Sequence, residues 1–220
     1  MLKPRHTADD VSEVGIDEAG RGCLWGPLVA AAVVWPEEST WTEEIRSISG
    51  KIRDSKLVSA KLRATLELKI KEFAVAWSVG TVSPQEIDSL GMTKSNRLAF
   101  DRALQGIHVP FGRLLIDGTL GLPQRDVQQC IEPKGDNTYL AIAAASILAK
   151  EGRDATVRAL CDAEPLLESR YSISSSKGYG TLKHREAIKA HGMHPNHRRL
   201  FLRKLLGLEH TVSQGCLIED

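Results

Sequence analysis

The segment VGIDEAGRGCLWGPLVAAAVV, residues 14–34, carries the strongest signal for the fold. Residues 14–16 are typical of a short apolar strand, and residues 28–34 form an almost unbroken apolar run suited to a central strand. Because a glycine-rich turn joins the two segments, we expect the strands to lie side by side. Two acids, Asp17 and Glu18, stand at the end of the first strand.

Hydrophobic spacing predicts the elements that follow. Ser83 to Glu86 reads as a helix-capping box with Pro84 at the first helical position. We expect helices over residues 59–73, 83–91 and 93–105, strands over 75–79, 113–116 and 127–131, and a helix of about 26 residues opening at Asp136. This order favours an α/β protein with helices on both faces of its sheet.

Composition and charge describe an ordinary folded domain with an uneven surface. The chain has 220 residues, 42% hydrophobic and 26% charged, which excludes disordered and fibrous classes. Residues 177–206 hold eight Lys or Arg against one acid, or +7, so the net charge of +1 leaves −6 for the rest. This indicates a surface for a polyanion, or a solvated basic helix face. We expect a catalytic core over residues 1–170, a basic helical extension over 171–208 and a flexible tail over 209–220.

The sequence signals for location and the spacing of the cysteines are those expected of an intracellular protein. No apolar run approaches the length of a membrane span, and the first residues carry no secretory signal, so we expect a cytoplasmic protein without a membrane part. The spacing of the cysteines fits neither a disulfide framework nor paired zinc ligands. We expect four reduced thiols, at Cys23, Cys130, Cys161 and Cys216.

Four acids at the ends of predicted elements, Asp17, Glu18, Asp117 and Asp136, are candidates for chemistry. If the strands that precede Asp17 and Asp117 are neighbours, their carboxyl ends bring these side chains together. A hard divalent cation, Mg²⁺ or Mn²⁺, would make such a cluster tolerable, and a pair of cations would suit phosphodiester hydrolysis. Each acid also has a structural interpretation: a helix N-cap for Asp136, a turn residue for Asp117 and a solvated strand end for the pair 17–18.

The sequence around these acids resembles that of the type 2 ribonuclease H family, ribonuclease HII. The matching segments, in order, are GIDEAGRG (15–22), GPLVAAAV (26–33), DSK (54–56), IDG (116–118), KGD (134–136), IAAASILAK (142–150), RD (153–154) and KGYGT (177–181) with His184. The resemblance implies a ribonuclease H-like three-layer α/β/α fold with a mixed central sheet and a helical C-terminal extension. It also implies an endoribonuclease that hydrolyses the RNA strand of RNA/DNA hybrids. Such enzymes nick duplex DNA 5′ of embedded ribonucleotides, leaving 3′-hydroxyl and 5′-phosphate ends, in ribonucleotide excision repair.

The resemblance also assigns roles to residues. Asp17, Glu18, Asp117 and Asp136 match the catalytic carboxylates that hold Mg²⁺ or Mn²⁺. The turn Gly20-Arg21-Gly22 matches the segment that packs into the minor groove at the ribonucleotide, where two glycines permit close approach. Lys56 matches a phosphate contact, and Tyr179 matches the tyrosine that stacks on the neighbouring sugar.

The chain departs from the family pattern at three places. Leu57 replaces a second basic residue, Trp25 stands where a small residue is usual, and residues 137–139 read Asn-Thr-Tyr. We expect weaker substrate binding near Lys56 and an altered cleft shape at Trp25 and at residues 137–139.

Three alternatives compete with this interpretation. The HIII family shares the core but carries a long N-terminal domain, for which 14 residues before Gly15 leave no room. A junction resolvase or transposase would share the acids but not the flanking motifs. A binding module without turnover would have no use for four mutually repelling carboxylates.

Partners and the histidine-rich segment complete the predictions. We expect structural or phosphate-facing roles, not metal binding, for His184, His191, His194 and His197. Residues 212–218 have a spacing weakly suggestive of sliding-clamp binding but lack its aromatic pair, so a clamp is a weak candidate partner. RNA/DNA hybrids and DNA with embedded ribonucleotides are the expected partners of a monomer.

Overall fold

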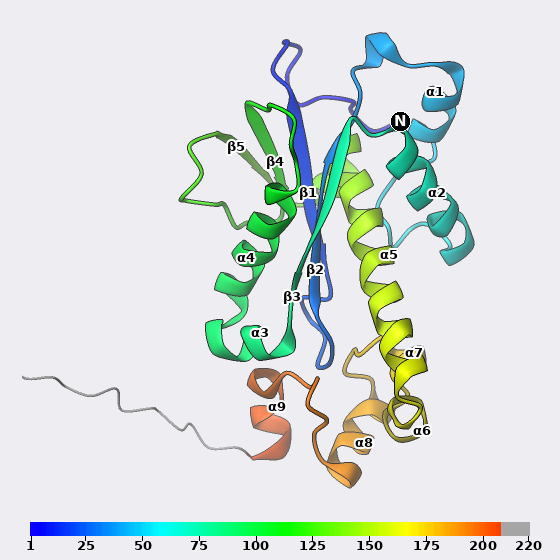
Figure 1. The fold of residues 1–220 in the computed structure, drawn as a ribbon, viewed down its shortest axis with the longest axis vertical. Helices are drawn as coiled ribbons and strands as arrows, with labels where there is room; N and C mark the ends of the chain where they lie inside the picture. The colour runs from blue at the N-terminus through cyan, green and yellow to red at the C-terminus, as the bar shows by residue number, and fades with distance from the viewer. Residues whose placement is uncertain (208–220) are drawn as a thin grey trace, which may run out of the picture.

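The computed structural model of the protein describes residues 1–207. Its centre is a five-stranded mixed sheet in the order β3-β2-β1-β4-β5 (Figure 1). β2 runs antiparallel to both β1 and β3, whereas β1, β4 and β5 run parallel to one another. The strands are β1 (Glu13–Ala19), β2 (Leu28–Val34), β3 (Ala76–Val82), β4 (Arg113–Asp117) and β5 (Gln128–Glu132).

Helices cover both faces of the sheet, which confirms the expected three-layer α/β/α arrangement (Figure 1). α4 lies against one face, and α2 and α5 lie against the other. The helices are α1 (Glu43–Ser49), α2 (Ala60–Phe73), α3 (Pro84–Leu90), α4 (Met92–Gln105), α5 (Leu140–Ala163), α6 (Leu166–Tyr171), α7 (Ile173–Ser176), α8 (Leu182–His191) and α9 (Arg199–Leu206), with 3-10 turns η1 (Glu38–Thr40) and η2 (Gly135–Asn137).

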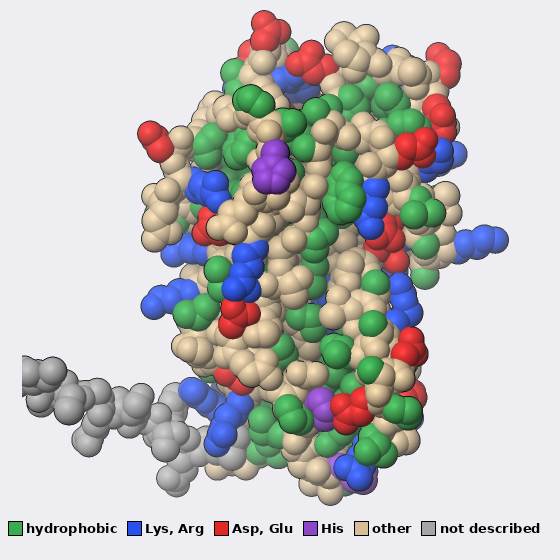
Figure 2. Space-filling model, viewed as in Figure 1, with side chains coloured by type: hydrophobic (Ala, Val, Ile, Leu, Met, Phe, Trp, Pro, Cys, Tyr) green, Lys and Arg blue, Asp and Glu red, His purple; other side chains and the backbone are tan. Residues whose placement is uncertain are grey.

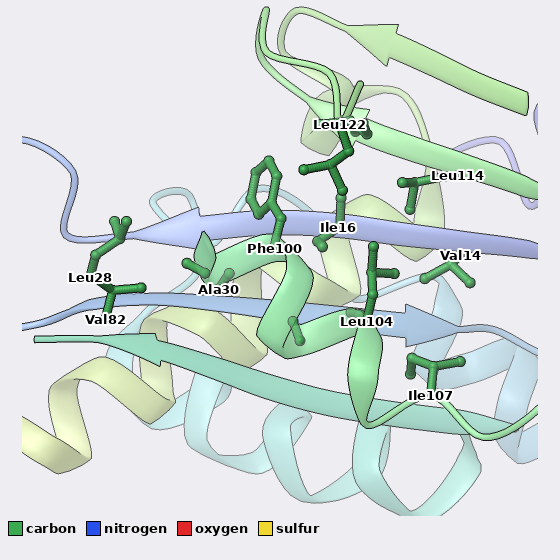
Figure 3. Close-up of a cluster of buried hydrophobic side chains, with 14 of the residues drawn as sticks. Val14, Ile16, Leu28, Ala30, Val82, Phe100, Leu104, Ile107, Leu114 and Leu122 are labelled. Carbon is green, nitrogen blue, oxygen red and sulfur yellow. The ribbon is translucent and has the colours of Figure 1, made fainter. Parts of the chain in front are cut away.

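β1 and β2 are central strands, and one of the two cores that bury them lies between the sheet and α4. All seven residues of β2 are buried, as expected for a strand covered on both faces. Figure 3 shows Phe100 and Leu104 of α4 packed against side chains from β1, β2 and β4, Ile16 and Leu114 among them. The alternation along β1 sends Val14, Ile16 and then Glu18 toward this face.

The opposite face of the sheet brings α5 unusually close to β1. A Cβ atom at Gly15 would lie 2.2 Å from the carbonyl carbon of Ala141 and 2.4 Å from the nitrogen of Ile142, so only glycine permits this approach. The alanines at 143–145 of α5 are fully buried in the hydrophobic cluster on this face of the sheet. The close contact places the beginning of α5 beside the end of β1 that carries Asp17.

A third hydrophobic cluster joins the C-terminal helices to the rest of the molecule. Leu167 of α6, Ile188 of α8 and Leu202 of α9 are buried with Val157 of α5 and with Trp25 from the loop between β1 and β2. The short helices therefore pack at one end of the sheet, below it in Figure 1.

Most expected elements form, with boundaries shifted by a few residues. Ser59 caps α2, Ser83 and Glu86 form the predicted capping box of α3, and Gly91 has the positive φ of 74° expected after that helix. Two short helices, α1 and α6, were not expected because such short segments lack a clear apolar stripe.

The predicted start of the long helix is wrong. Asp136 lies in the 3-10 turn η2, and α5 begins only at Leu140. Lys134 adopts a left-handed backbone, with φ 62° and ψ 37°, and Tyr139 is extended, so the chain makes a separate turn before the helix. Asp136 is therefore not the N-cap of α5.

Some expectations concern residues that the structure does not describe. The tail over 209–220, the clamp-like segment 212–218 and Cys216 lie outside residues 1–207. Within those residues, no helix is both long and apolar enough to cross a membrane. Cys23, Cys130 and Cys161 are free thiols.

Candidate active site

Parallel pairing of β1 and β4 brings Asp17 and Asp117 to the same edge of the sheet. The register pairs Ile16 with Ile116, and the two aspartates are the next residue on each strand. This confirms the expected condition that the two strands are neighbours. Since Asp17 follows Gly15 by two positions, its side chain lies on the face covered by α5.

Asp136 and Glu18 approach this edge from the two faces of the sheet. The backbone N–H of Gly135 donates to Oδ1 of Asp117 at 2.7 Å, which ties the turn carrying Asp136 to β4. Glu18 lies on the α4 face, where Nδ2 of Asn96 donates to its Oε2 at 3.4 Å.

A cleft opens at this end of the sheet. It is lined by three acids, by the turn after β1, by the segment 55–56, by part of α5 and by Tyr179. The lining residues are Asp17, Glu18, Ala19, Gly20, Arg21, Gly22, Ser55, Lys56, Asp117, Ser146, Lys150 and Tyr179. The cleft thus includes eight of the nine predicted site residues, and the ninth, Asp136, is not among the residues that line it.

The acids are in an electrostatic environment that disfavours their charge. Burial raises the pKa of the Asp17 carboxyl well above its usual range, and the carboxylates of Glu18 and Asp117 raise it further. Burial also raises the pKa of Glu18, against the opposing effect of Arg21, whose Nη1 lies 3.7 Å from Oε1 of Glu18. Burial and the nearby carboxylate of Asp117 raise the pKa of Asp136. The cluster therefore holds more negative charge than the neighbouring Arg21 and Lys56 offset.

Lys56 responds to the same excess of negative charge. Burial works against its ammonium group, but the carboxylates around it, that of Asp54 foremost, raise its pKa above the usual value. Its side chain is 80% exposed at the mouth of the cleft. The backbone N–H of Lys56 donates to Oδ1 of Asp54 at 2.9 Å, which holds this short loop in place.

The oxygen-rich cluster fits a hard divalent cation that takes some of its ligands from the protein and the others from water and substrate. Within residues 1–207, no three His, Cys, Asp or Glu side chains are grouped closely enough to hold a metal ion by themselves. Mg²⁺ is commonly bound by one or two carboxylates together with water and substrate phosphate, not by a complete protein cage. An open set of carboxylates, in which Asp17, Glu18 and Asp136 have raised pKa values, matches that mode of binding.

Several residues that support the acids were not singled out from the sequence. Asn96 on α4 and Ser146 on α5 hydrogen-bond the carboxyl groups of Glu18 and Asp17 and lower their pKa values. The hydroxyl of Ser146 also bonds that of Ser55 at 3.0 Å, and Lys150 lines the cleft. Ser146 and Lys150 fall within the family-like segment 142–150, but their contacts with the acids appear only when the fold shows which face of α5 they occupy.

The structure corrects two expectations about residues near the cleft. Trp25 does not shape the cleft, since it is fully buried in the third hydrophobic cluster and its Nε1 donates to His194 at 3.3 Å. Arg198 does not belong to the basic surface, since it is also fully buried and its guanidinium donates to backbone carbonyls. The other Lys and Arg side chains of residues 177–206 are exposed or half-buried. Figure 2 shows Lys and Arg side chains at its lower end, where α8 and α9 lie in Figure 1.

Three of the four histidines make structural contacts, one of the two roles that were expected. His184 and His197 are buried, and their Nε2 atoms lie 3.0 Å apart. His194 bonds Glu164 and Trp25, and His191 is exposed.

A mixed sheet with helices on both faces and carboxylates gathered at the ends of two parallel strands defines an α/β protein of the ribonuclease H-like fold. A family model described as ribonuclease HII matches residues 14–204. The chain belongs to the ribonuclease HII family, and it is an endonuclease of the ribonuclease H type. This decides against the HIII, resolvase and binding-module alternatives.

Curated relatives and solved structures agree with this assignment. The chain is 44% identical over 189 residues to a ribonuclease HII of Parabacteroides distasonis, covering 86% of this chain and 89% of that one. It is 42% identical over 207 residues to a ribonuclease HII of Bacteroides thetaiotaomicron, covering 94% and 96%. The fold resembles the crystal structure of ribonuclease H2 from Pyrococcus horikoshii, with a TM-score of 0.70, 27% identity and coverage of 88% and 96%. It also resembles ribonuclease HII in its complex with PCNA from Archaeoglobus fulgidus, with a TM-score of 0.67, 23% identity and coverage of 94% and 98%.

Proposed function

We propose that this enzyme cleaves the RNA strand of RNA/DNA hybrids and nicks duplex DNA on the 5′ side of embedded ribonucleotides, leaving 3′-hydroxyl and 5′-phosphate ends. The convergence of Asp17, Glu18, Asp117 and Asp136 on one end of the sheet is the observation that carries the proposal. Ribonucleotide excision repair in the cytoplasm is the role that follows.

The four carboxylates would hold Mg²⁺ or Mn²⁺, with two ions during hydrolysis. When bound, these ions supply an activated water and stabilise the charge on the leaving oxygen. The protein contributes a rigid arrangement of acids, because the hydrogen bonds from Gly135 to Asp117 and from Asn96 to Glu18 fix the side chains before substrate arrives. Asp17 is held the same way by the backbone N–H of Glu18, at 2.6 Å from its Oδ1.

The other residues that line the cleft would bind the substrate. The turn Gly20-Arg21-Gly22 is exposed at residues 21 and 22, and a Cβ at Gly22 would meet no atom within 4 Å, so the backbone is open to a nucleic acid strand. Tyr179 is 43% exposed beside it and is suited to stacking on a sugar. Lys56 and the basic side chains of α8 and α9 would contact phosphates, which position a duplex without reading its sequence.

The organisation of the chain supports a core with a helical appendage. We propose a catalytic core over residues 1–170 and an extension over 171–208 that is packed on it through the third hydrophobic cluster. The expected monomer stays a prediction. A sliding clamp as partner also stays a prediction, and the relative solved with PCNA makes it worth testing.

One incubation tests the proposal. The purified protein is mixed with a labelled DNA duplex that holds one ribonucleotide, or with a continuous hybrid, in Mg²⁺, Mn²⁺ or EDTA, and the ends are mapped. We expect a metal-dependent nick 5′ of the ribonucleotide. Cleavage of the hybrid alone would contradict the embedded-ribonucleotide part of the proposal, and no cleavage of either substrate would contradict all of it.

A further inference from the structure

Two adjacent residues, His197 and Arg198, reach the two segments that we propose contact substrate. Their side chains are 2% and 0% exposed. They lie just before α9, where the backbone N–H of Arg198 donates to the carbonyl of Leu24 at 2.8 Å. The pair is thus built into the body of the protein and directed toward the loops at the edge of the cleft.

Arg198 holds the turn after β1 through its carbonyl groups. Its Nη1 donates to the carbonyl oxygens of Gly20 and Arg21 at 2.7 and 3.1 Å, and its Nε donates to that of Gly26 at 2.9 Å. No carboxylate within residues 1–207 pairs with this guanidinium, and its Nη2 has no hydrogen-bond partner there. An arginine buried in this way serves the backbone conformation of the turn.

The direction of those carbonyls determines where the N–H groups of the turn point. In a trans peptide the C=O and the following N–H point in opposite directions. Because the carbonyls of Gly20 and Arg21 point inward to Arg198, the N–H groups of Arg21 and Gly22 point outward, on the side that lines the cleft. Neither N–H donates to an acceptor in the described part of the chain, so both are available to an oxygen of the substrate.

His197 reaches Tyr179 through His184, and the contacts determine the tautomer of each ring. The backbone N–H of His194 donates to Nδ1 of His197 at 2.7 Å, so Nδ1 carries no proton and Nε2 does. Nε2 of His197 therefore donates to Nε2 of His184, 3.0 Å away. Nδ1 of His184 then donates to the carbonyl oxygen of Tyr179 at 2.9 Å.

We propose that His197 and Arg198 are positioning residues that hold the Gly20-Arg21-Gly22 turn and Tyr179 at a fixed separation, and so favour a single ribonucleotide within DNA over a continuous hybrid. This inference rests on the proposed function. A single ribonucleotide can bind in one register only, so both contacts must fit at once. A continuous hybrid offers many registers and tolerates a shift between the two segments.

The test compares cleavage rates on the two substrates in Mg²⁺ for three variants and a control. Arg198→Lys keeps the charge but cannot reach the three carbonyls, and His197→Phe keeps the ring but leaves Nε2 of His184 without its donor. His197→Gln restores a donor and an acceptor. Arg113→Lys is the control, because Arg113 is also a buried arginine, 4% exposed, but lies at the opposite end of β4 from Asp117.

We expect Arg198→Lys and His197→Phe to lower the ratio of the single-ribonucleotide rate to the hybrid rate by about tenfold, the effect of losing one or two buried hydrogen bonds. His197→Gln should recover much of the ratio, and Arg113→Lys should leave it unchanged. An unchanged ratio in the first two variants, including a parallel fall of both rates, would overturn the inference. Failure of the proposed function would look different, since the wild-type enzyme itself would not nick.

A measurement on the wild-type protein tests the relay without any variant. Nitrogen NMR of the imidazole rings should show His197 protonated at Nε2 only and His184 protonated at Nδ1 only. Any other tautomer, or a charged imidazolium on either ring at neutral pH, would rule out the connection to Tyr179.

Discussion

Asp17 and Asp117 occupy matching positions on neighbouring parallel strands, each directly after the Ile16–Ile116 pair that ends the ladder. The two strands are 100 positions apart in sequence, yet their pairing leaves these side chains at one edge of the sheet. Burial and mutual repulsion raise the pKa of Asp17, so the ionised acid destabilises the protein that holds it. The active site is therefore a place where stability is lowered for function.

Replacing Asp17 by Asn should uncouple stability from activity. Because the amide removes a charge that burial disfavours, we expect Asp17→Asn to raise the unfolding temperature in EDTA. Cleavage should fall by about a hundredfold or more, since a carboxylate for the metal ions is lost. Thermal melts and rate measurements check both parts. A control, Asp9→Asn, removes an acid paired with Arg113 and should lower the unfolding temperature without loss of cleavage.

Metal binding should stabilise the protein through the same carboxylates. A ligand at a hundredfold excess over its dissociation constant adds about 2.7 kcal/mol to the free energy of unfolding. We expect Mg²⁺ or Mn²⁺ to raise the unfolding temperature of the wild-type protein and to have almost no effect on Asp117→Asn. An equal rise in both proteins would show that the ions bind elsewhere.

Lys56 should act on affinity and not on stability. Its side chain is largely exposed, so Lys56→Ala should leave the unfolding temperature unchanged. If it neutralises one phosphate, the slope of log binding constant against log salt should become shallower by about 0.9. Lys71→Ala, which removes the same charge near the other end of α2, should leave the slope unchanged. A loss of affinity that is independent of salt would contradict a phosphate contact.

The buried histidines should make stability fall in acid. Burial lowers the pKa of His197 to about 3, and burial also lowers that of His184. Below a pH of about 6.5 these two histidines bind protons in the unfolded chain but not in the folded protein. The contribution is complete above the unfolded pKa and is lost as the pH falls below it.

Denaturant unfolding at several pH values measures this effect. His197 should contribute a slope that approaches about 1.4 kcal/mol per pH unit between roughly pH 6 and pH 5, and His184 should act in the same direction. His197→Gln should remove one such contribution, so the wild-type protein should lose stability more steeply than the variant. Parallel curves for the two proteins would show that His197 titrates normally in the folded state.

The sequence predicted the parts of the fold that follow from local patterns. The apolar run of β2, the capping box of α3 and the spacing of α2 appear as expected, because each depends on residues close together in the chain. The acid cluster could be predicted for a related reason, since acids at strand ends meet whenever the strands are neighbours.

The parts that could not be predicted depend on contacts between distant residues. Arg198 lies in a strongly basic segment and reads as surface charge, but the carbonyls of residues 20, 21 and 26 surround it in the fold. The start of α5 was misplaced because Asp136 resembles an N-cap, while the turn that holds it is fixed by the hydrogen bond from Gly135 to Asp117. Long-range hydrogen bonds of this kind leave no periodic signal.

Replacing either of two glycines near the active site by alanine should have a different effect: Gly15→Ala should lower stability, and Gly22→Ala should weaken substrate binding. In Gly15→Ala the new Cβ would collide with the backbone of α5 at Ala141, so β1 and α5 must separate, which should cost about 1–3 kcal/mol of unfolding free energy or more. In Gly22→Ala the new Cβ meets nothing, so stability should stay the same. Yet a methyl group on the exposed turn should obstruct a nucleic acid strand and raise KM for the single-ribonucleotide duplex.

Denaturant unfolding and steady-state kinetics on both variants separate packing from substrate contact. For Gly22→Ala we expect a wild-type unfolding curve with weakened substrate binding, because the turn faces the cleft and not the core. For Gly15→Ala we expect a large loss of stability, with cleavage falling as well because α5 carries Ser146 next to Asp17. A Gly22→Ala enzyme with unchanged KM would remove the turn from the substrate-binding surface, whatever the behaviour of Gly15→Ala.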